Sequence, residues 1–348
     1  MHMADALISP VVGGAMWAAT AGVAAYSIKK VQSDIDQKKI PLMGVMGAFI
    51  FAAQMINFSI PGTGSSGHLG GGLILAILLG PYAGFLTMAS ILTIQALFFA
   101  DGGLLALGSN IFNLGFFTCF LAYPLIYKKI VGKEYSAKRI MIASMITAVV
   151  GLQLGAFGVV LETLFSGKTE LPFKTFVLLM QPIHLAIGIV EGLVTAAVIS
   201  FVWKARPEIL EKVSLNQPLG NLSLKKVMIG LAAVAVFTGA VLSWFASSHP
   251  DGLEWSMFKT SGKEELEAEG NIHQKMSGIQ SKTAFLTGYG FKPSESQAPI
   301  EEAEEKWPAV NGGTSLSGLV GGSMTLLLAV FMGFIINATN KVRKKRIK

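Results

Sequence analysis

The sequence predicts an all-α polytopic membrane protein, and three observations lead to that prediction. First, 52% of its 348 residues are hydrophobic and 14% are charged, whereas soluble domains carry about 25% charged residues. Second, the charges lie outside long apolar runs, many of which approach the ~20 residues that a helix needs to cross a bilayer. Third, these runs are continuous and not alternating, which predicts helices rather than a barrel.

The hydropathy pattern predicts nine membrane spans. The third is short and ends at Gly80-Pro81, a pair that breaks apolar runs, so residues 69–100 could instead form one long kinked span. The positive-inside rule favours nine spans. With that count, 20 of the 28 Lys and Arg residues fall on the cytoplasmic side, the N-terminus lies outside and the C-terminus lies inside. The predicted spans are residues 11–27, 43–60, 69–79, 83–100, 111–127, 140–165, 175–203, 227–246 and 316–338.

The chain divides near residue 215 into two units. Residues 1–205 form a predicted seven-helix body, and residues 206–221 form a polar cytoplasmic linker. Residues 222–348 form a two-helix hairpin, whose outer loop at 249–313 carries 11 of the 21 acidic residues. Acidic side chains there could attract divalent cations weakly or simply form a solvated loop.

The first two residues can bind a metal ion by chelation. The α-amine of Met1, with a pKa of about 7.7–8, the amide nitrogen of His2 and the His2 imidazole would form two fused chelate rings. Planar nitrogen donors of this kind suit Ni(II) or Cu(II). The alternative is an ordinary start residue followed by a chance histidine.

Two further polar sites interrupt the apolar pattern. His68 follows the glycine-rich stretch PGTGSSG, which is not a nucleotide-binding loop, and the predicted topology places it on the same outer face as Met1 and His2. His184 and Glu191 lie seven residues apart, on one face of a predicted helix. A histidine or glutamate beside lipid is either functional or satisfied by structural hydrogen bonds, and the sequence leaves both interpretations open.

Small residues spaced four apart form ridges on two predicted spans. One ridge consists of Gly14, Ala18 and Gly22, and the other begins at Gly44 and continues through Ala48 and Ala52. Such ridges permit close helix–helix approach. Their partners are other helices of this chain or helices of another subunit.

The sequence argues against enzymatic chemistry. It contains no H-E-x-x-H, G-x-S-x-G or nucleotide-binding motif, which disfavours a membrane-embedded hydrolase. The single cysteine, Cys119, has no partner for a disulfide or a cysteine-based metal site. The net charge of +7 indicates cytoplasmic loops rather than binding to nucleic acid.

Three separated motifs resemble the NikM/CbiM family of substrate-capture (S) components of nickel and cobalt energy-coupling-factor transporters. They are MHMADAL at residues 1–7, the stretch from Gln54 to Gly71, and the segment from Pro182 to Gly192. The sequence PDGLE at residues 250–254 resembles the small N component, here fused to the S component. The resemblance implies three metal-ligating residues, Met1, His2 and His68. It also suggests four outer-sphere or structural polar residues, Asn57, Ser66, His184 and Glu191.

The resemblance implies a transport subunit of a prokaryotic cell membrane. It would bind Ni(II) at the outer face for ATP-driven import, with no cofactor besides the transported ion. Co(II) import by the same mechanism is the alternative, and a gradient-driven transporter with His184 and Glu191 as a relay is a second. The implied partners are a transmembrane coupling subunit, a pair of ATP-binding subunits and membrane lipid, with no nucleic acid.

Overall fold

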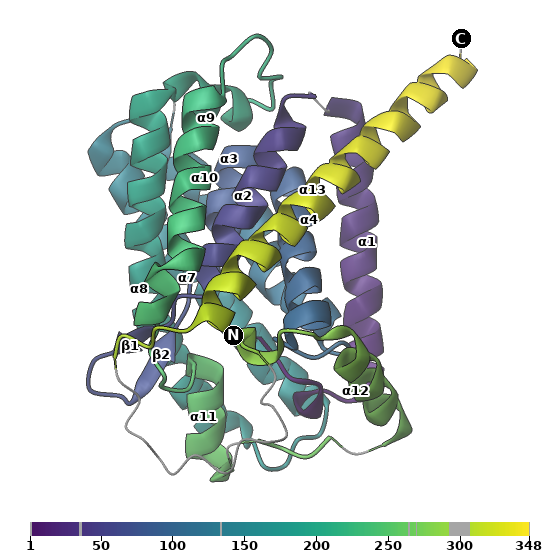
Figure 1. The fold of residues 1–348 in the computed structure, drawn as a ribbon, viewed down its shortest axis with the longest axis vertical. Coiled ribbons are helices and arrows are strands. Elements are labelled where there is room, and N and C mark those ends of the chain that lie inside the picture. The colour runs from purple at the N-terminus through teal and green to yellow at the C-terminus, as the bar shows by residue number, and fades with distance from the viewer. Residues whose placement is uncertain are drawn as a thin grey trace.

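The computed structural model describes residues 2–34, 37–132, 134–263, 265–268, 270–291 and 307–347. These residues form a bundle of helices with one two-stranded sheet at one end (Figure 1). The elements of the first part are η1 (Asp5–Leu7), α1 (Pro10–Asp34), α2 (Lys39–Gln54), β1 (Phe58–Ile60), β2 (Ser65–Gly67), α3 (Gly72–Leu79), α4 (Pro81–Ile94), η2 (Gln95–Phe99), α5 (Leu107–Ile111), η3 (Phe112–Tyr127), α6 (Lys128–Val131), α7 (Ala137–Phe165) and α8 (Phe173–Ala205). The elements of the second part are α9 (Pro207–Ser214), α10 (Lys225–Ala240), η4 (Leu242–Phe245), α11 (Gly252–Ser261), α12 (Asn271–Thr283), η5 (Thr287–Tyr289) and α13 (Gly312–Ile347).

Six helical segments of the described chain are long and apolar enough to cross a membrane, which confirms a predominantly helical membrane protein. α2, α3 and α10 are apolar but shorter, with 16, 8 and 16 residues. Each of the nine predicted apolar runs lies mainly on a helix. The six long segments are Pro10–Gln32, Pro81–Phe99, Leu107–Val131, Ala137–Phe165, Phe173–Ala205 and Gly312–Asn340.

The predicted span 43–60 is wrong at its C-terminal end. The helix α2 stops at Gln54, and β1 then pairs with β2 in an antiparallel hairpin. Gly62 and Gly64 in the connecting turn have φ angles of 77° and 72°, a left-handed conformation that glycine adopts without steric cost. The hairpin therefore begins inside the run that hydropathy assigned to a helix, and it leads the chain towards His68.

The break at Gly80-Pro81 separates two helices, as the nine-run prediction required. Gly80 has a φ of 85°, which ends α3, and Pro81 begins α4, the helix position that proline tolerates best. Every residue of α3 is buried. α3 lies at the centre of the bundle, where it packs against α4 and η3.

The second part of the chain packs directly on the first. α13 and α10 lie against α2, and they also contact each other (Figure 1). A Cβ atom at Gly44 would lie 2.5 Å from a methyl carbon of Val330 on α13. The small-residue ridge of α2 is therefore occupied by a helix of the same chain. By contrast, a Cβ atom at Gly14 or Gly22 on α1 would meet nothing within 4 Å.

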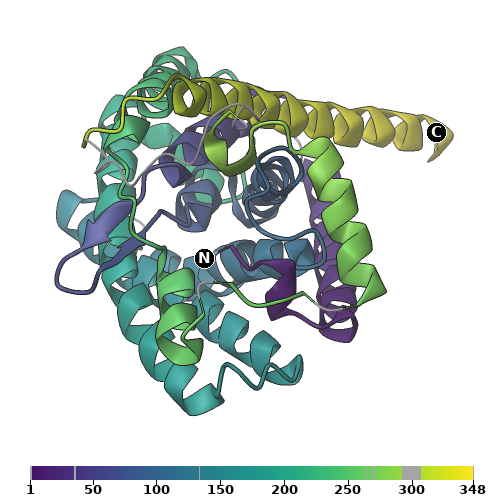
Figure 2. The same cartoon turned by 60° about the horizontal axis from the view of Figure 1, so that its bottom comes forward.

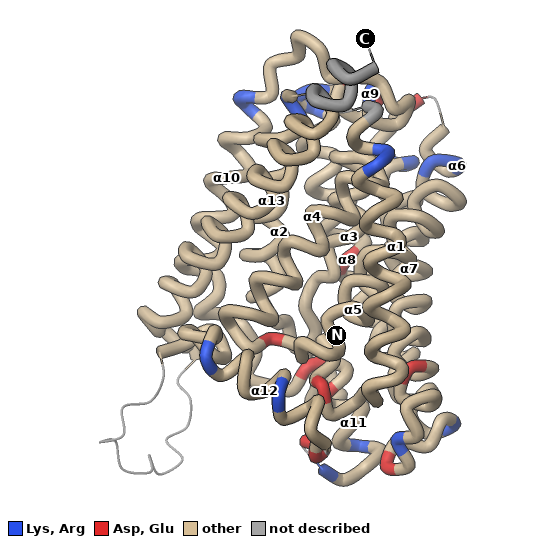
Figure 3. Tube along the Cα trace, turned by 90° about the vertical axis from the view of Figure 1, so that its right-hand side faces the viewer, with Lys and Arg blue, Asp and Glu red and all other residues tan. Residues whose placement is uncertain are grey.

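The segment between α10 and α13 covers the end of the bundle that holds the hairpin. Figure 2 shows the start of the chain near the middle of this end, with the green helices α11 and α12 on either side of it. Figure 3 shows most acidic residues at this end and lysine and arginine with few acids at the opposite end, around α6 and α9. The fold thus surrounds the N-terminal segment with elements from both parts of the chain.

Candidate metal centre

The N-terminal segment is held inside the bundle by Asn110 on α5. Its side chain accepts a hydrogen bond from the Met3 amide at 2.8 Å and donates one to the Met3 carbonyl at 3.1 Å. The amide of Gly103 donates a second hydrogen bond to the same carbonyl at 2.9 Å. Met3 is fully buried, and both its backbone groups are hydrogen-bonded. These hydrogen bonds therefore fix the position of the neighbouring residue, His2.

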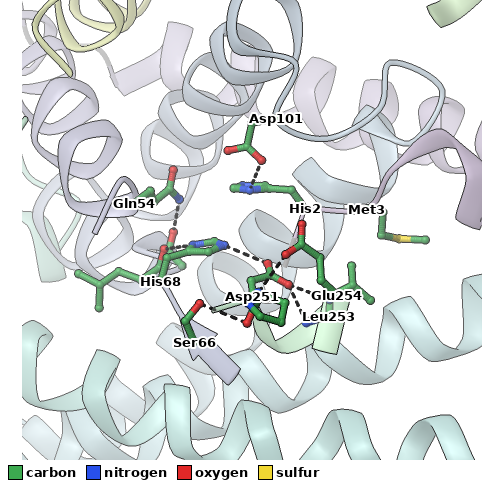
Figure 4. Close-up of polar contacts among 12 residues, drawn as sticks. His2, Met3, Gln54, Ser66, His68, Asp101, Asp251, Leu253 and Glu254 are labelled. Atoms are coloured by element: carbon green, nitrogen blue, oxygen red, sulfur yellow. Dashed lines mark hydrogen bonds and ion pairs between the residues drawn. The ribbon is translucent and has the colours of Figure 1, made fainter. Parts of the chain in front are cut away.

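The structure brings His2 and His68 together (Figure 4). Their imidazole rings stack with centroids 4.9 Å apart and planes inclined by 11°. Both side chains are 7% exposed. The third predicted ligand, Met1, lies outside the described residues.

The ring nitrogens of His68 have different surroundings. Nδ1 lies 3.1 Å from the carbonyl oxygen of Leu69, so a proton on Nδ1 would be donated there. Nε2 then carries the lone pair, and it faces Oδ2 of Asp251 at 3.7 Å. Burial is the largest cause that lowers the pKa of His68 from its ordinary value. A neutral imidazole is the form of histidine that binds a metal.

The carboxylate of Asp101 orients the imidazole of His2. Nδ1 of His2 lies 2.9 Å from Oδ1 of Asp101, and the hydroxyl of Tyr289 donates to Oδ2 of the same carboxylate at 2.5 Å. Burial acts to raise the pKa of Asp101, but the contacts of its carboxylate with His2 and Tyr289, together with the nearby His68, lower that pKa overall. Asp101 is therefore an ionised partner that links His2 to the second part of the chain.

Glu191 supports the loop that carries His68. Its carboxylate accepts hydrogen bonds from the amides of Gly70 at 3.0 Å and Gly71 at 2.9 Å. Gln54 donates to the Gly70 carbonyl at 2.8 Å. Gly71 has a φ of 77°, so the loop bends where only glycine fits without strain. Glu191 thus orients the loop rather than facing the cluster of imidazoles.

The other three predicted polar residues have separate roles. Ser66 donates its amide to the Pro250 carbonyl at 2.8 Å and its hydroxyl to the His249 carbonyl at 2.7 Å. Asn57 accepts a hydrogen bond from the Ser247 amide at 2.7 Å through its backbone carbonyl. Nδ1 of His184 lies 2.8 Å from the carbonyl of Met180, one turn earlier on α8.

The described side chains do not form a complete metal site by themselves. Among them, no group of three or more His, Cys, Asp and Glu side chains has an arrangement that could hold a metal ion. The carboxylates of Asp101 and Asp251 lie beside the two imidazoles, one next to each ring. A chelate here would require the backbone nitrogens at the N-terminus in addition to the two rings.

Sequence reasoning missed the residues that hold the imidazoles in place. Asn110 and Asp101 lie near the ends of apolar runs, where single polar residues look like ordinary loop or helix-end positions. Asp251 has a detectable signal, because Asp251 followed by Glu254 matches a helix capping box, and both halves of that box form here. The capping pattern locates α11, but it does not show that α11 begins beside His68.

The chain matches two protein-family models. The CbiM model, described as the cobalt uptake substrate-specific transmembrane region, matches residues 2–209. The chain belongs to this family. A second model, the PDGLE domain, matches residues 225–338, which confirms the resemblance to the NikM/CbiM family with a fused N-component-like region.

Relatives in the CbiM family are named as transport proteins for nickel or cobalt. A putative fused nickel transport protein NikMN of Archaeoglobus fulgidus is 37% identical over 240 residues, covering 69% of this chain and 77% of that protein. A fused nickel transport protein NikMN of Rhodobacter capsulatus is 32% identical, covering 60% and 64%. The cobalt transport protein CbiM of Sorangium cellulosum is 27% identical, covering 62% and 96%.

A solved structure shows a related fold. The crystal structure of a transition metal transporter is 32% identical, with a TM-score of 0.53, and covers 62% of this chain and 98% of that one. The family and the six long apolar helices identify a multi-pass membrane protein of a prokaryotic cell. Its relatives are transport proteins, in keeping with the absence of catalytic motifs.

Proposed function

We propose that this chain captures Ni(II) at the outer face of the membrane for ATP-driven import by an energy-coupling-factor transporter. The observation that carries the proposal is the stacking of His2 on His68 at 4.9 Å, across a separation of more than 60 residues in the sequence. The proposed ligands are the α-amine of Met1, the amide nitrogen and Nδ1 of His2, and Nε2 of His68. Nδ1 of His2 would exchange its contact with Asp101 for the ion.

Nickel is the preferred cargo for two reasons. Four nitrogens in a plane suit Ni(II), and the fused relatives in Archaeoglobus and Rhodobacter are named as nickel transport proteins. Cobalt is the alternative, because a relative of the same family is named as a cobalt transport protein. Titration calorimetry with each ion on the purified chain separates these two cargoes.

The proposed topology places the N-terminus outside and the C-terminus in the cytoplasm. It comprises a seven-helix capture domain at 1–205, a linker at 206–221 and a two-helix domain at 222–348. Lysine and arginine lie at both ends of the bundle (Figure 3), but 20 of the 28 fall on the proposed cytoplasmic side, which supports this orientation because these residues favour that side. Labelling of single cysteines at the two ends in intact cells tests the orientation.

The proposed partners are a transmembrane coupling subunit and a pair of ATP-binding subunits. The exposed ridge of Gly14, Ala18 and Gly22 on α1 supports a docking role, because it is accessible along the helix and small residues let another helix approach closely. The main rival is a gradient-driven transporter with a relay from His184 to Glu191. In the structure these two residues have different hydrogen-bond partners, Met180 and the Gly70–Gly71 loop.

The decisive experiment is a Ni(II) titration of the purified wild-type chain and the variants His2→Ala and His68→Ala. The proposal predicts that each substitution removes most of the affinity. Unchanged affinity in either variant would mean that the ligands are misassigned. Uptake by cells that express this chain without ATP-binding partners, abolished by an uncoupler, would instead support the gradient-driven transporter.

A further inference from the structure

An apolar groove lies between α8 and α10, with α2 behind it (Figure 1). Its volume is about 460 Å³, and its lining comes almost entirely from aliphatic and aromatic side chains. Ala197 and Phe201 on α8 and Val234 on α10 line the groove and are exposed, whereas Phe49 on α2 is buried. The groove therefore opens to the surroundings of the helices, which in a membrane are the acyl chains of lipids.

The groove is long and narrow. Its lining on α8 runs from Val190 to Phe201, a length of helix of about 17 Å, or roughly one leaflet of the ~30 Å hydrocarbon core. The volume of about 460 Å³ divided by this length gives a mean cross-section of about 27 Å². A helix with its side chains is about 10–12 Å across and so has a cross-section of roughly 80–110 Å². The groove thus fits one extended hydrocarbon chain better than it fits another helix.

Two lysines flank one end of the groove. Lys204 lies three residues beyond Phe201 on α8, and Lys226 lies four residues before Gly230 on α10, where Phe201 and Gly230 both line the groove. Residues at these intervals share a face of a helix, so the lysines continue the groove beyond its apolar lining. Both lysines are exposed, and neither side chain forms a hydrogen bond or ion pair with another residue that the structure describes.

The charge at this end of the groove is complementary to a phosphate group. Residues 204–226, which connect the end of α8 to the start of α10, include five lysine or arginine residues and two glutamates. The proposed topology places this segment at the cytoplasmic face. Basic side chains between membrane helices at that face bind anionic lipid headgroups, and each lysine near the surface favours an anionic lipid about fivefold. An acyl chain with a phosphate at its end therefore matches both parts of the groove.

We propose that the groove binds one anionic phospholipid, with an acyl chain between α8 and α10 and the phosphate beside Lys204 and Lys226. The lipid fills the space between the first part of the chain, which contributes α8, and the second part, which contributes α10. It stabilises their packing, because side chains that line an unfilled space lose dispersion contacts. The proposal goes beyond metal capture and does not depend on the identity of the transported ion.

The test places the full-length chain in vesicles of equal parts phosphatidylglycerol and phosphatidylcholine with identical acyl chains. The chain is then released into detergent, and native mass spectrometry counts the lipids that it retains. We expect the wild type to retain one phosphatidylglycerol with a preference of about tenfold or more over phosphatidylcholine. Lys204→Gln combined with Lys226→Gln should remove this preference. Lys29→Gln combined with Lys138→Gln, at two exposed lysines that follow or begin other helices, is the matched control and should preserve it.

A second pair of variants tests the apolar part of the groove. Ala197→Phe fills the groove from an exposed position of its lining, and it should abolish retention of the bound lipid. Ala233→Phe is the matched control, because Ala233 is an exposed residue of α10 that does not line the groove. This control should retain phosphatidylglycerol as the wild type does. Thermal unfolding of each variant shows that it is folded.

Equal retention of the two lipids by the wild type would overturn the proposal. So would an unchanged preference for phosphatidylglycerol after removal of both Lys204 and Lys226, or equal lipid retention by Ala197→Phe and Ala233→Phe. If a transmembrane helix of a partner subunit displaces the lipid when the complex assembles, and Ala197→Phe prevents that assembly, the groove is a docking site for protein and the lipid assignment is refuted.

Discussion

Replacement of Asn110 by alanine should weaken metal binding, although Asn110 is not a proposed ligand. The substitution removes two hydrogen bonds to the backbone of Met3, and Met3 is fully buried. A buried backbone group that loses its partner costs about 1–3 kcal/mol. If the docked N-terminal segment loses this much stability relative to the released segment, the Kd for Ni(II) should rise by about 5–150-fold.

Asn113→Ala provides a matched control for Asn110→Ala. Asn113 lies three residues further along the chain and is equally buried, but its amide donates to the carboxylate of Glu162 at 3.0 and 3.1 Å. Calorimetric titration of both variants with Ni(II), together with their thermal unfolding, distinguishes a local clamp from general destabilisation. Wild-type affinity in Asn110→Ala, or equal losses in both variants, would refute the argument that Asn110 positions the N-terminus.

Three further outcomes follow from the site. Glu191→Gln should weaken Ni(II) binding about tenfold, because an amide cannot accept hydrogen bonds from both Gly70 and Gly71 as the carboxylate does; equal affinity in a titration would contradict this. Gly71→Ala should reduce the thermal stability of the chain, because its φ is 77° and a Cβ atom would lie 2.6 Å from Ile50; an unchanged melting temperature would count against it. The affinity for Ni(II) should fall in acid, because protons compete with the ion for the nitrogen ligands. The pKa of His68 is lowered from its ordinary value of 6.5, so loss of this ligand should come only below that pH; a titration series in which the His68-dependent part of the affinity is lost above pH 6.5 would contradict this.

Much of the fold could be predicted from the sequence because segments that cross a lipid bilayer must be long, apolar and hydrogen-bonded internally. Continuous apolar runs predicted the long helices, and the Gly80-Pro81 pair correctly separated α3 from α4. The hairpin at residues 58–67 was missed because its first strand continues the apolar run of α2, so hydropathy alone does not mark the change. The glycines of the following turn were visible, but a turn signal does not reveal which residues will pair.

The candidate site was predictable only in part for a related reason. His2 and His68 carry chemistry that can be recognised from residue type, and the predicted topology placed them on one face. The residues that fix them, Asn110, Asp101 and Asp251, act through contacts between segments distant in the sequence. Asp251 lies 183 residues from His68 along the chain, and its role depends on how the second unit packs on the first. Such contacts follow from tertiary packing rather than from any local pattern.

The central claim is that the metal is bound by the N-terminus itself, and a chain with a modified N-terminus tests this claim most directly. The chain should be purified in two forms, one with a free Met1 amine verified by mass spectrometry and one with a single added residue before Met1. Both forms are then titrated with Ni(II) by calorimetry. The account predicts tight binding by the free form and loss of that binding in the extended form. Equal affinity in the two forms would contradict the proposed chelate.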